Sequence, residues 1–283
     1  MTAIPSGGLG PFRLAGRVLL YVVLIVAAVA ILVPFFWMIS ASLKRNNEVL
    51  SIPVQWIPKD FQWKNFSDIW TQIPMGTYLR NTVFLSAVIT FLQVLTGSFA
   101  AYGFAKLRFP GRDALFFAYV ATIAVPWQAY MIPQYIMMQK AGLTNTFWSL
   151  ILLQAFGAFG VFLMRQYYLT IPEELSEAAR VDGLSEYGIW ARIILPLSKP
   201  ALASLGLLTF VNTWNDYMGP FIYLTSNDLW TIQLGLRSFV GQFDADYAMM
   251  MTGSVLSVLP ILLIFLVGQR YFIQGIATSG MKG

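Results

Sequence analysis

Long apolar stretches alternate with short polar segments along the whole chain. A helix needs about 20 predominantly apolar residues to cross the hydrocarbon core of a bilayer. Six stretches approach or exceed that length, at residues 18–40, 82–104, 114–137, 145–163, 201–224 and 248–272. The pattern therefore predicts an all-α integral membrane protein with six transmembrane helices.

The basic residues give these predicted helices a direction. Six spans place both termini on the same side of the membrane, and lysine and arginine are enriched in cytoplasmic loops. With the termini inside, 11 of the 18 lysines and arginines lie on the inner side and 7 on the outer side. The first stretch is longer than the ~7–15-residue core of a signal peptide, so we expect it to be retained. The charges favour cytoplasmic N- and C-termini, with one membrane domain over residues 1–283.

Composition narrows the classes of function. The chain is 57% hydrophobic and 11% charged, whereas soluble domains contain about 25% charged residues. It contains no cysteine and no histidine. The chain therefore has no thiolate metal ligand, and it lacks the residue that serves most often as a metal ligand and as a general base. We therefore expect no metal site and no catalytic residue. The net charge of +5 is spread over loop ends, which is typical of membrane orientation and not of a nucleic-acid-binding surface.

A polar segment at residues 165–199 separates the fourth and fifth apolar stretches. Acidic residues at the start of a helix suit the positive end of its dipole, and Gly183 tolerates the positive φ at which a helix ends and turns. We predict a helix over residues 173–182, a turn at Gly183, and a second short helix that Ser185 caps and Pro196 ends. The residues of interest in this segment are Glu177, Ala178, Ala179, Asp182, Gly183, Ile193, Leu195 and Pro196.

Most of these residues form a spaced pattern, E-A-A-x3-G-x9-I-x-L-P, which resembles the EAA signature of ABC importer permeases. The whole chain is similar to the carbohydrate, MalG-like branch of that family. The resemblance implies the type I ABC importer permease fold in the prokaryotic cytoplasmic (inner) membrane. It also implies that residues 165–199 form a cytoplasmic coupling loop that docks on an ATPase. A solvated helix that happens to contain Glu-Ala-Ala is the alternative for the tripeptide alone.

The same resemblance implies partners. They are a second, MalF-like permease and two copies of an ATP-binding cassette ATPase, which together make a heterotetramer, and an extracytoplasmic sugar-binding protein. The chain has no G-x-x-x-x-G-K-[ST] phosphate loop, so we expect ATP and Mg²⁺ on the ATPases and no cofactor on this chain. The tail resembles the MalG-type C-terminus, which inserts between the ATPase subunits, although a frayed chain end is the alternative. Its residues are Gly280, Met281, Lys282 and Gly283.

Polar residues inside the fifth stretch are candidates for the translocation pathway. A charged Asp216 costs about 2.5–3.5 kcal/mol at the centre of a bilayer and less toward its outer third, where we place it. On a continuous helix it shares one face with Asn212, Asn215 and Gly219. We expect this face to line the pathway, and an interhelical hydrogen-bonded cluster without substrate contact is an equal alternative.

The third stretch contains residues that suit two different roles. Sugar binding by ring stacking and amide hydrogen bonds is one role, and an interfacial aromatic belt, which the composition favours, is the other. These residues are Trp127, Gln128, Tyr130 and Gln134. We also expect Pro126 and Pro133 in this stretch, and Pro260 in the sixth, to kink their helices.

Together these features predict a non-enzymatic permease subunit that translocates a sugar or oligosaccharide. An ion-coupled secondary transporter is the alternative from another class. It needs paired acids or an ion site on broken helices, and usually an internal repeat. Asp216 is the clear intramembrane acid and the sequence shows no repeat. Within the importer family, a non-sugar solute such as a glycerol phosphodiester is a further alternative.

Overall fold

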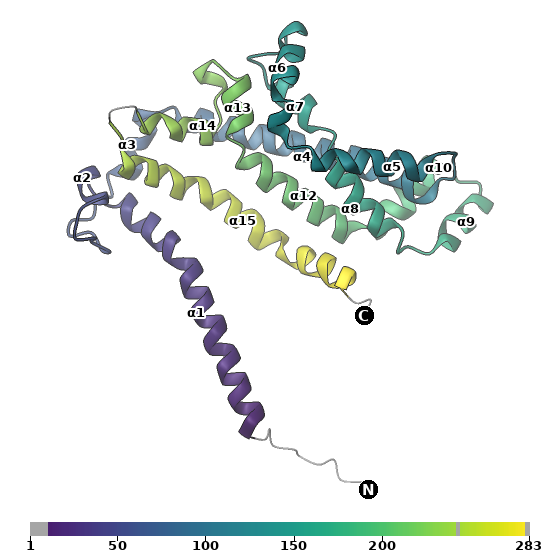
Figure 1. Ribbon diagram of the computed structural model, residues 1–283, viewed down its shortest axis with the longest axis horizontal. Helices are drawn as coiled ribbons and strands as arrows, with labels where there is room; N and C mark the ends of the chain where they lie inside the picture. The colour runs from purple at the N-terminus through teal and green to yellow at the C-terminus, as the bar shows by residue number, and fades with distance from the viewer. Residues whose placement is uncertain (1–10, 242–243, 281–283) are drawn as a thin grey trace. The chain divides into compact units, whose positions relative to one another are not determined.

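The computed structural model describes residues 11–241 and 244–280, and most of them are helical (Figure 1). The α-helices are α1 (Pro11–Ser42), α2 (Asn46–Val49), α3 (Asn65–Gln72), α4 (Met75–Lys106), α5 (Arg112–Ala121), α6 (Met131–Lys140), α7 (Phe147–Gln154), α8 (Ala158–Tyr168), α9 (Glu173–Val181), α10 (Glu186–Ile189), α11 (Leu195–Leu197), α12 (Lys199–Trp214), α13 (Met218–Tyr223), α14 (Ile232–Leu236) and α15 (Tyr247–Gly280). Four single turns are 3₁₀-helical: η1 (Thr122–Ala124), η2 (Trp127–Ala129), η4 (Asn227–Leu229) and η5 (Arg237–Phe239). The segment η3 (Trp190–Ile194) is a π-helix. Among the described residues, β-pairing is limited to an isolated bridge between Val240 and Ala245.

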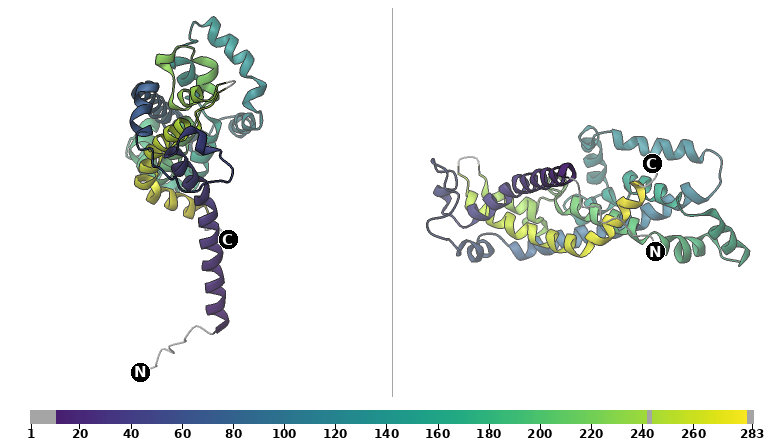
Figure 2. Two further views of the ribbon diagram at one scale, coloured as in Figure 1. Left: turned by 90° about the vertical axis from the view of Figure 1, so that its left-hand side faces the viewer. Right: turned by 90° about the horizontal axis from the view of Figure 1, so that it is seen from below.

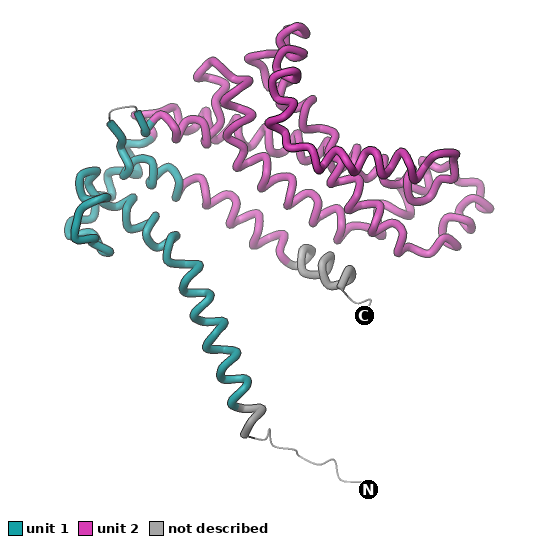
Figure 3. Tube along the Cα trace, viewed as in Figure 1, with its two compact units in different colours: residues 1–69, 239–255 teal, residues 70–238, 256–283 magenta. Residues whose placement is uncertain are grey.

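The chain divides into two compact units, which are coloured separately in Figure 3. Unit 1 comprises residues 1–69 and 239–255, and unit 2 comprises residues 70–238 and 256–283. The divisions fall inside α3, η5 and α15, so each of these helices belongs in part to both units. We describe each unit by itself.

Unit 2 is built around α4, which packs against α8 and α12 (Figures 1 and 2). Gly97 and Gly160 lie at the α4–α8 contact, where a Cβ on Gly97 would lie 3.4 Å from the backbone of Gly160. Small residues at such a contact let two membrane helices approach closely. Near the C-terminal end of α4, a buried cluster that includes Tyr102, Tyr168 and Ile189 joins these helices to the segment that follows α8.

The third predicted span, residues 114–137, is broken. It consists of α5, η1, η2 and α6, with Val125 in an extended conformation between the two 3₁₀ turns. Pro126 explains the break, because proline disfavours the helical conformation of the preceding residue. Pro133 is the third residue of α6, a first-turn position where a missing N–H is tolerated, so the prediction that it kinks a helix was wrong. Pro260 lies inside α15, which continues to Gly280.

The fifth predicted span, residues 201–224, is also broken. α12 ends at Trp214 and α13 begins at Met218. Pro220 accounts for this interruption, since it cannot donate a hydrogen bond to the carbonyl group of Asp216 and its ring would clash with that group in a continuous helix. The expectation that Asn212, Asn215, Asp216 and Gly219 share one helical face was therefore wrong.

Four described helical segments are long and apolar enough to cross a membrane: Ala15–Ser42, Met75–Lys106, Phe147–Tyr168 and Tyr247–Gln269. A fifth span results if Glu186–Leu197 and Lys199–Trp214, which meet at an 81° bend, count as one. The expected coverage of 145–163 and 248–272 thus agrees with observed helices within a few residues. A count of six continuous helices is not what the described residues form.

Unit 1 contains α1, whose apolar side chains are exposed from Val18 through Ile31. A helix that is apolar on every side requires lipid or another protein around it. At its C-terminal end the chain is held by side chains: Ser40 Oγ donates to the Trp56 carbonyl at 2.6 Å, and Lys44 lies over the Trp37 ring. Lys44 also donates to the Gln55 carbonyl, and burial lowers the pKa of its amine.

Candidate functional site

The signature segment forms the predicted helix and turn. α9 runs from Glu173 to Val181, with Glu173 and Glu174 in its first turn. Gly183 has a φ of +82°, a conformation that residues with a Cβ rarely adopt. A Cβ at this position would meet nothing within 4 Å, so the requirement for glycine comes from the backbone and not from crowding. Ser185 then caps α10, because its Oγ accepts a hydrogen bond from the Gly188 amide at 3.3 Å.

The second helix of this segment forms where predicted, and it contains a π-helical turn. α10, η3 and α11 follow one another without a break from Glu186 to Leu197, and Pro196 lies inside α11. The prediction that Pro196 marks the end of this helix is confirmed, because the helix ends one residue later, at Leu197. Pro196 cannot donate to the carbonyl group of Arg192, four residues earlier, and its ring would clash there in an α-helix. The wider π-helical turn, where bonds run from residue i to i+5, removes that conflict just before the proline.

The signature residues have different exposures. Ala179 is 4% exposed and belongs to the buried cluster of unit 2, so it packs inward. Glu177, Ala178, Asp182 and Gly183 are exposed, as is Pro196, whereas Ile193 and Leu195 are half-buried. Val181 is 88% exposed. One face of α9 therefore packs inside unit 2, and the other presents a small, partly apolar and acidic surface.

Five side chains joined by four polar contacts tie this segment to α4, and because both end residues lie on α4 we call the set the ring. Lys106 on α4 pairs with Glu173 at 3.2 Å, and Glu173 pairs with Arg180 at 3.5 Å. Arg180 pairs with Glu186 at 2.8 Å, and the Tyr102 hydroxyl, also on α4, donates to Glu186 at 2.5 Å. Tyr102 and Lys106 are four residues apart, which places them on one face of the helix.

Within the ring, Arg180 and Glu186 stabilise each other's charged forms. The hydrogen bond from Arg180 lowers the pKa of the Glu186 carboxyl, and the same bond raises the pKa of Arg180. Lys106 is 3% exposed and also donates to the Ile171 carbonyl at 2.7 Å. A buried ammonium group is stable only when it is paired in this way. The ring therefore holds α9 and α10 as one body with the end of α4.

A second contact holds the start of α8's C-terminal turn. Arg165 donates to the Phe104 carbonyl at 3.1 Å, pairs with Asp113 at 3.0 Å, and lies 4.0 Å from the centre of the Phe116 ring. Hydrogen bonding from Arg112 and the positive charges of Arg112 and Arg165 lower the pKa of Asp113. α4, α5 and α8 are thus linked just before the segment that carries the signature.

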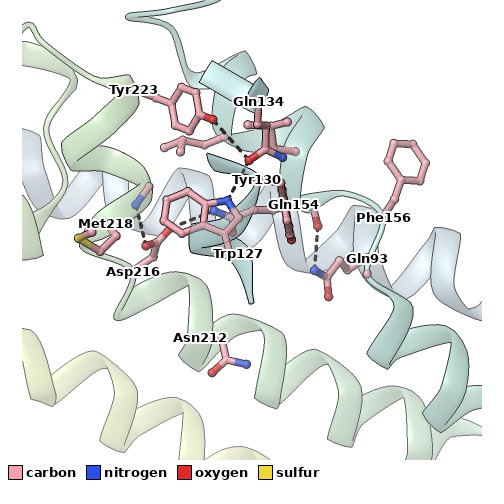
Figure 4. Close-up of a pocket in the computed structure, with 14 residues that line it drawn as sticks. Gln93, Trp127, Tyr130, Gln134, Gln154, Phe156, Asn212, Asp216, Met218 and Tyr223 are labelled. Atoms are coloured by element: carbon pink, nitrogen blue, oxygen red, sulfur yellow. Dashed lines mark hydrogen bonds between the residues drawn. The ribbon is translucent and has the colours of Figure 1, made fainter. Parts of the chain in front are cut away.

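Farther along unit 2, two cavities of about 400 and 500 Å³ share part of their lining and lie beside the breaks in three helical segments. Figure 4 shows the smaller one. Irregular backbone at membrane depth is tolerated where it is buried in protein or lines a cavity. The residues that line both cavities come from α4, η2, the single residue between η2 and α6, α7, the α7–α8 connection and α12: Gln93, Trp127, Tyr130, Gln154, Phe156, Gly157 and Asn212.

Asp216 is fixed at the edge of the smaller cavity. Its Oδ2 accepts a hydrogen bond from Gln154 Nε2 at 2.9 Å, and its Oδ1 accepts one from the Gly219 amide at 3.0 Å. A Cβ on Gly219 would clash with Asp216 Oδ2, so glycine is needed for this close approach. Gln93 continues the network by donating to the Gln154 carbonyl at 2.8 Å.

The structure brings together only part of the predicted pathway set. Asn212, Asp216 and Gly219 line the smaller cavity. Asn215 does not, and its amide donates back to the Val211 carbonyl at 2.9 Å. Of the residues assigned to an aromatic belt, Trp127, Tyr130 and Gln134 line the cavity, and Trp127 Nε1 donates to Gln134 Oε1 at 2.8 Å.

The sequence analysis did not find the ring or the amides of Gln93 and Gln154. A signal for the ring was present, because Tyr102 and Lys106 are spaced i,i+4 at the end of an apolar stretch and Glu173 and Arg180 are spaced i,i+7. For the predicted tail, α15 ends at Gly280, and Met281, Lys282 and Gly283 lie outside the described residues.

Comparison with known proteins decides the family. Residues 93–278 match the family described as "Binding-protein-dependent transport system inner membrane component". The chain belongs to this family. It is 35% identical over 253 residues to the arabinooligosaccharides transport system permease protein AraQ of Halalkalibacterium halodurans, covering 88% of this chain and 91% of that protein. It is 34% identical over 259 residues to the lactose transport system permease protein LacG of Rhizobium radiobacter, covering 92% and 94% of the two chains.

A solved structure has the same fold. A chain of a bacterial ABC transporter involved in the import of the acidic polysaccharide alginate matches with a TM-score of 0.81 and 24% identity, over 96% of this chain and all of that one. The protein is thus a membrane-embedded permease component of a transport system with an ABC importer permease fold. The predicted family is confirmed.

Proposed function

We propose that this permease is one of two membrane-spanning subunits of an ATP-driven importer that carries a sugar or oligosaccharide across a prokaryotic inner membrane. An extracytoplasmic binding protein delivers the sugar. A second, MalF-like permease and two ATPase subunits complete a heterotetramer. The family membership and the substrates named for AraQ and LacG support this proposal.

The observation that carries the mechanism is the ring at the signature segment. α9 exposes Glu177 and Ala178, and Asp182 directly after it is exposed as well. Glu173 and Arg180 tie the same helix to α4. An ATPase that docks on the exposed side and moves would carry α9 and α10 with it. The paired charges would then pass that movement to α4 and to the helices packed on it.

The proposal also includes a topology. We propose six crossings with cytoplasmic termini in one permease domain, in which α7 and α8 form one crossing and the interrupted segments α5–α6 and α12–α13 form two others. The broken crossings then meet at the cavities that Gln93, Gln154 and Asn212 line. The C-terminal tail reaches between the ATPase subunits. ATP and Mg²⁺ are held by those subunits, and this chain binds neither.

Paired cysteine substitutions test the docking surface. Ala178 is exposed and its neighbour Ala179 is buried, so Ala178→Cys and Ala179→Cys form a matched pair in a chain with no native cysteine. In the purified complex, position 178 or 177 should form a disulfide with cysteines placed on the ATPase surface, and position 179 should not. Failure of both exposed positions to cross-link in any nucleotide state would contradict the docking assignment.

Uptake of radiolabelled arabinotriose and lactose by cells with and without the gene tests the substrate class.

A further inference from the structure

The two adjoining cavities of unit 2 have an uneven distribution of charge. Among the described residues that line them, Asp216 is the only acid and none is lysine or arginine. The other polar side chains with several hydrogen-bonding groups are amides, namely Gln93, Gln134, Gln154 and Asn212. A ligand that entered would meet one negative charge, uncharged donors and acceptors, and aromatic rings.

The hydrogen bonds around Asp216 show how that charge is held. Both carboxylate oxygens accept hydrogen bonds from N–H groups, those of Gln154 and Gly219. An ionised carboxylate has about four acceptor positions, so two of them are left for a ligand. These positions suit hydroxyl donors, because hydrogen bonds to an ionised acceptor are about twice as strong as neutral ones.

The remaining walls suit a sugar ring in size and chemistry. Volumes of 400 and 500 Å³ lie within the range of about 300–1,000 Å³ for small-molecule sites. Trp127, Tyr130 and Phe156 supply aromatic surface for the C–H face of a sugar. Asn212 is exposed and lines both cavities, so its amide can reach the hydroxyl groups of a ligand.

We infer that these cavities are a subsite for uncharged sugars, in which Asp216 selects against uronic acids and sugar phosphates. The inference rests on the proposed function and adds the charge class of its substrate. An anionic group 4 Å from Asp216 would lower occupancy by roughly 5-fold if fully solvated and by roughly 1,000-fold at the effective dielectric constant of a protein interior. No basic side chain in the described lining offsets this repulsion.

Thiol modification of the purified transporter complex measures this charge effect without knowledge of the transported sugar. Asn212→Cys places a thiol in the lining of both cavities, and this chain has no other cysteine. Cationic and anionic methanethiosulfonates are compared, each normalised to its rate with a free thiol. The ratio of cationic to anionic rates should exceed about 5 and should fall toward 1 when Asp216→Asn is added. Asparagine preserves an acceptor for the Gly219 amide, and the Gln154 amide can turn to present its oxygen.

A control thiol separates the local field from a general effect. Gln139→Cys lies on α6, is exposed, and is absent from both linings. Its rate ratio should be unchanged by Asp216→Asn. An Asn212→Cys ratio that does not respond to Asp216→Asn, or a Gln139→Cys ratio that responds equally, would overturn the assignment of charge selection to Asp216.

Protection by sugars tests the ligand. Galactotriose and maltotriose are the neutral probes. Trigalacturonate, which carries a carboxylate at C6 of each sugar, is the anionic counterpart of galactotriose. At least one neutral sugar should slow modification of Asn212→Cys several-fold, and trigalacturonate should not, unless Asp216→Asn is present. Absence of protection by both neutral sugars, or equal protection by trigalacturonate, would overturn the proposal. If cells that carry the transporter take up no sugar while the rate ratio and the protection are as expected, the result counts against the proposed function and not against the role of Asp216.

Discussion

Removal of the Tyr102 hydroxyl opens the ring that joins α4 to the signature segment. Tyr102 donates to Glu186 at 2.5 Å, and Glu186 also accepts from Arg180 at 2.8 Å. In the Tyr102→Phe variant, α10 loses its direct bond to α4, while Lys106 and Glu173 still connect α9 to the same helix. We expect ATP hydrolysis by the complex to persist while less sugar is imported for each ATP consumed.

The magnitude follows from the exposure of the acceptor. A hydrogen bond to a charged group contributes about 1.5–3 kcal/mol. The Glu186 side chain is 40% exposed, so water replaces part of the lost bond and a value below that range, about 1 kcal/mol, is the better expectation. About 1 kcal/mol corresponds to a roughly 5-fold change in the fraction of molecules in which the signature segment moves without α4. The ratio of uptake to hydrolysis should fall by about that factor.

A double-mutant cycle in proteoliposomes tests this reasoning. Glu186→Gln alone should lower the ratio at least as much as Tyr102→Phe, and the double variant should lose about 1 kcal/mol less than the sum, because both changes remove the same bond. Tyr187→Phe is the control on the same short helix. Tyr187 is 69% exposed and stacks on Phe99, a contact that phenylalanine keeps. If Tyr102→Phe behaves like Tyr187→Phe, or if the two changes in the cycle are additive, the ring does not transmit movement.

Three further outcomes are expected. Gly183→Val should raise the free energy of the turn by about 1–2 kcal/mol, because φ is +82° and valine is strained in that conformation. Uptake and stimulated ATP hydrolysis should then fall. Gly183→Asn should keep more of both activities, because asparagine tolerates this conformation. The pKa of Glu186 is lowered from its ordinary value of 4.5, so the ionised carboxylate stabilises the folded complex above that pH, and this contribution is lost as the pH falls through the folded-state pKa. The stability of Glu186→Gln should therefore fall less steeply below about pH 4.5 when the purified complex is unfolded by acid. Equal profiles for the two proteins would count against the pairing. Gly219→Ala places a Cβ against Asp216 and should destabilise the complex by about 1–3 kcal/mol in thermal unfolding, whereas Gly103→Ala, with nothing within 4 Å of its Cβ, should not.

Local chemistry made the signature segment predictable from the sequence. The acids at the start of α9, the positive φ of Gly183 and the cap at Ser185 each depend on residues within a few positions of one another. The apolar spans near α1, α4, α8 and α15 were predictable for the same reason, because about 20 apolar residues suffice to define them.

The cavity was predictable only in part, since it depends on where helices stop. Hydropathy treats residues 114–137 and 201–224 as continuous, but Pro126 and Pro220 interrupt them. Those interruptions moved Asp216 off a helical face and placed it beside Gln154, 62 residues earlier in the chain. A contact between segments so far apart has no local signal in one sequence. The same holds for the pairing of Tyr102 with Glu186.

The π-helical turn at Trp190–Ile194 sets the rotational phase of everything that follows it. An α-helix advances about 100° per residue, and the π-helical turn holds one residue more than an α-helical turn. Deletion of one residue would let the turn return to α-helical geometry with nearly the same phase downstream, whereas insertion of one residue would rotate the downstream helix by about 100° relative to α10. Ile194, which is fully buried, would then leave its place in the core while Glu186 kept its bond to Tyr102. Single-residue insertions between residues 190 and 194 should therefore be tolerated far less well than single-residue deletions or conservative substitutions at the same positions.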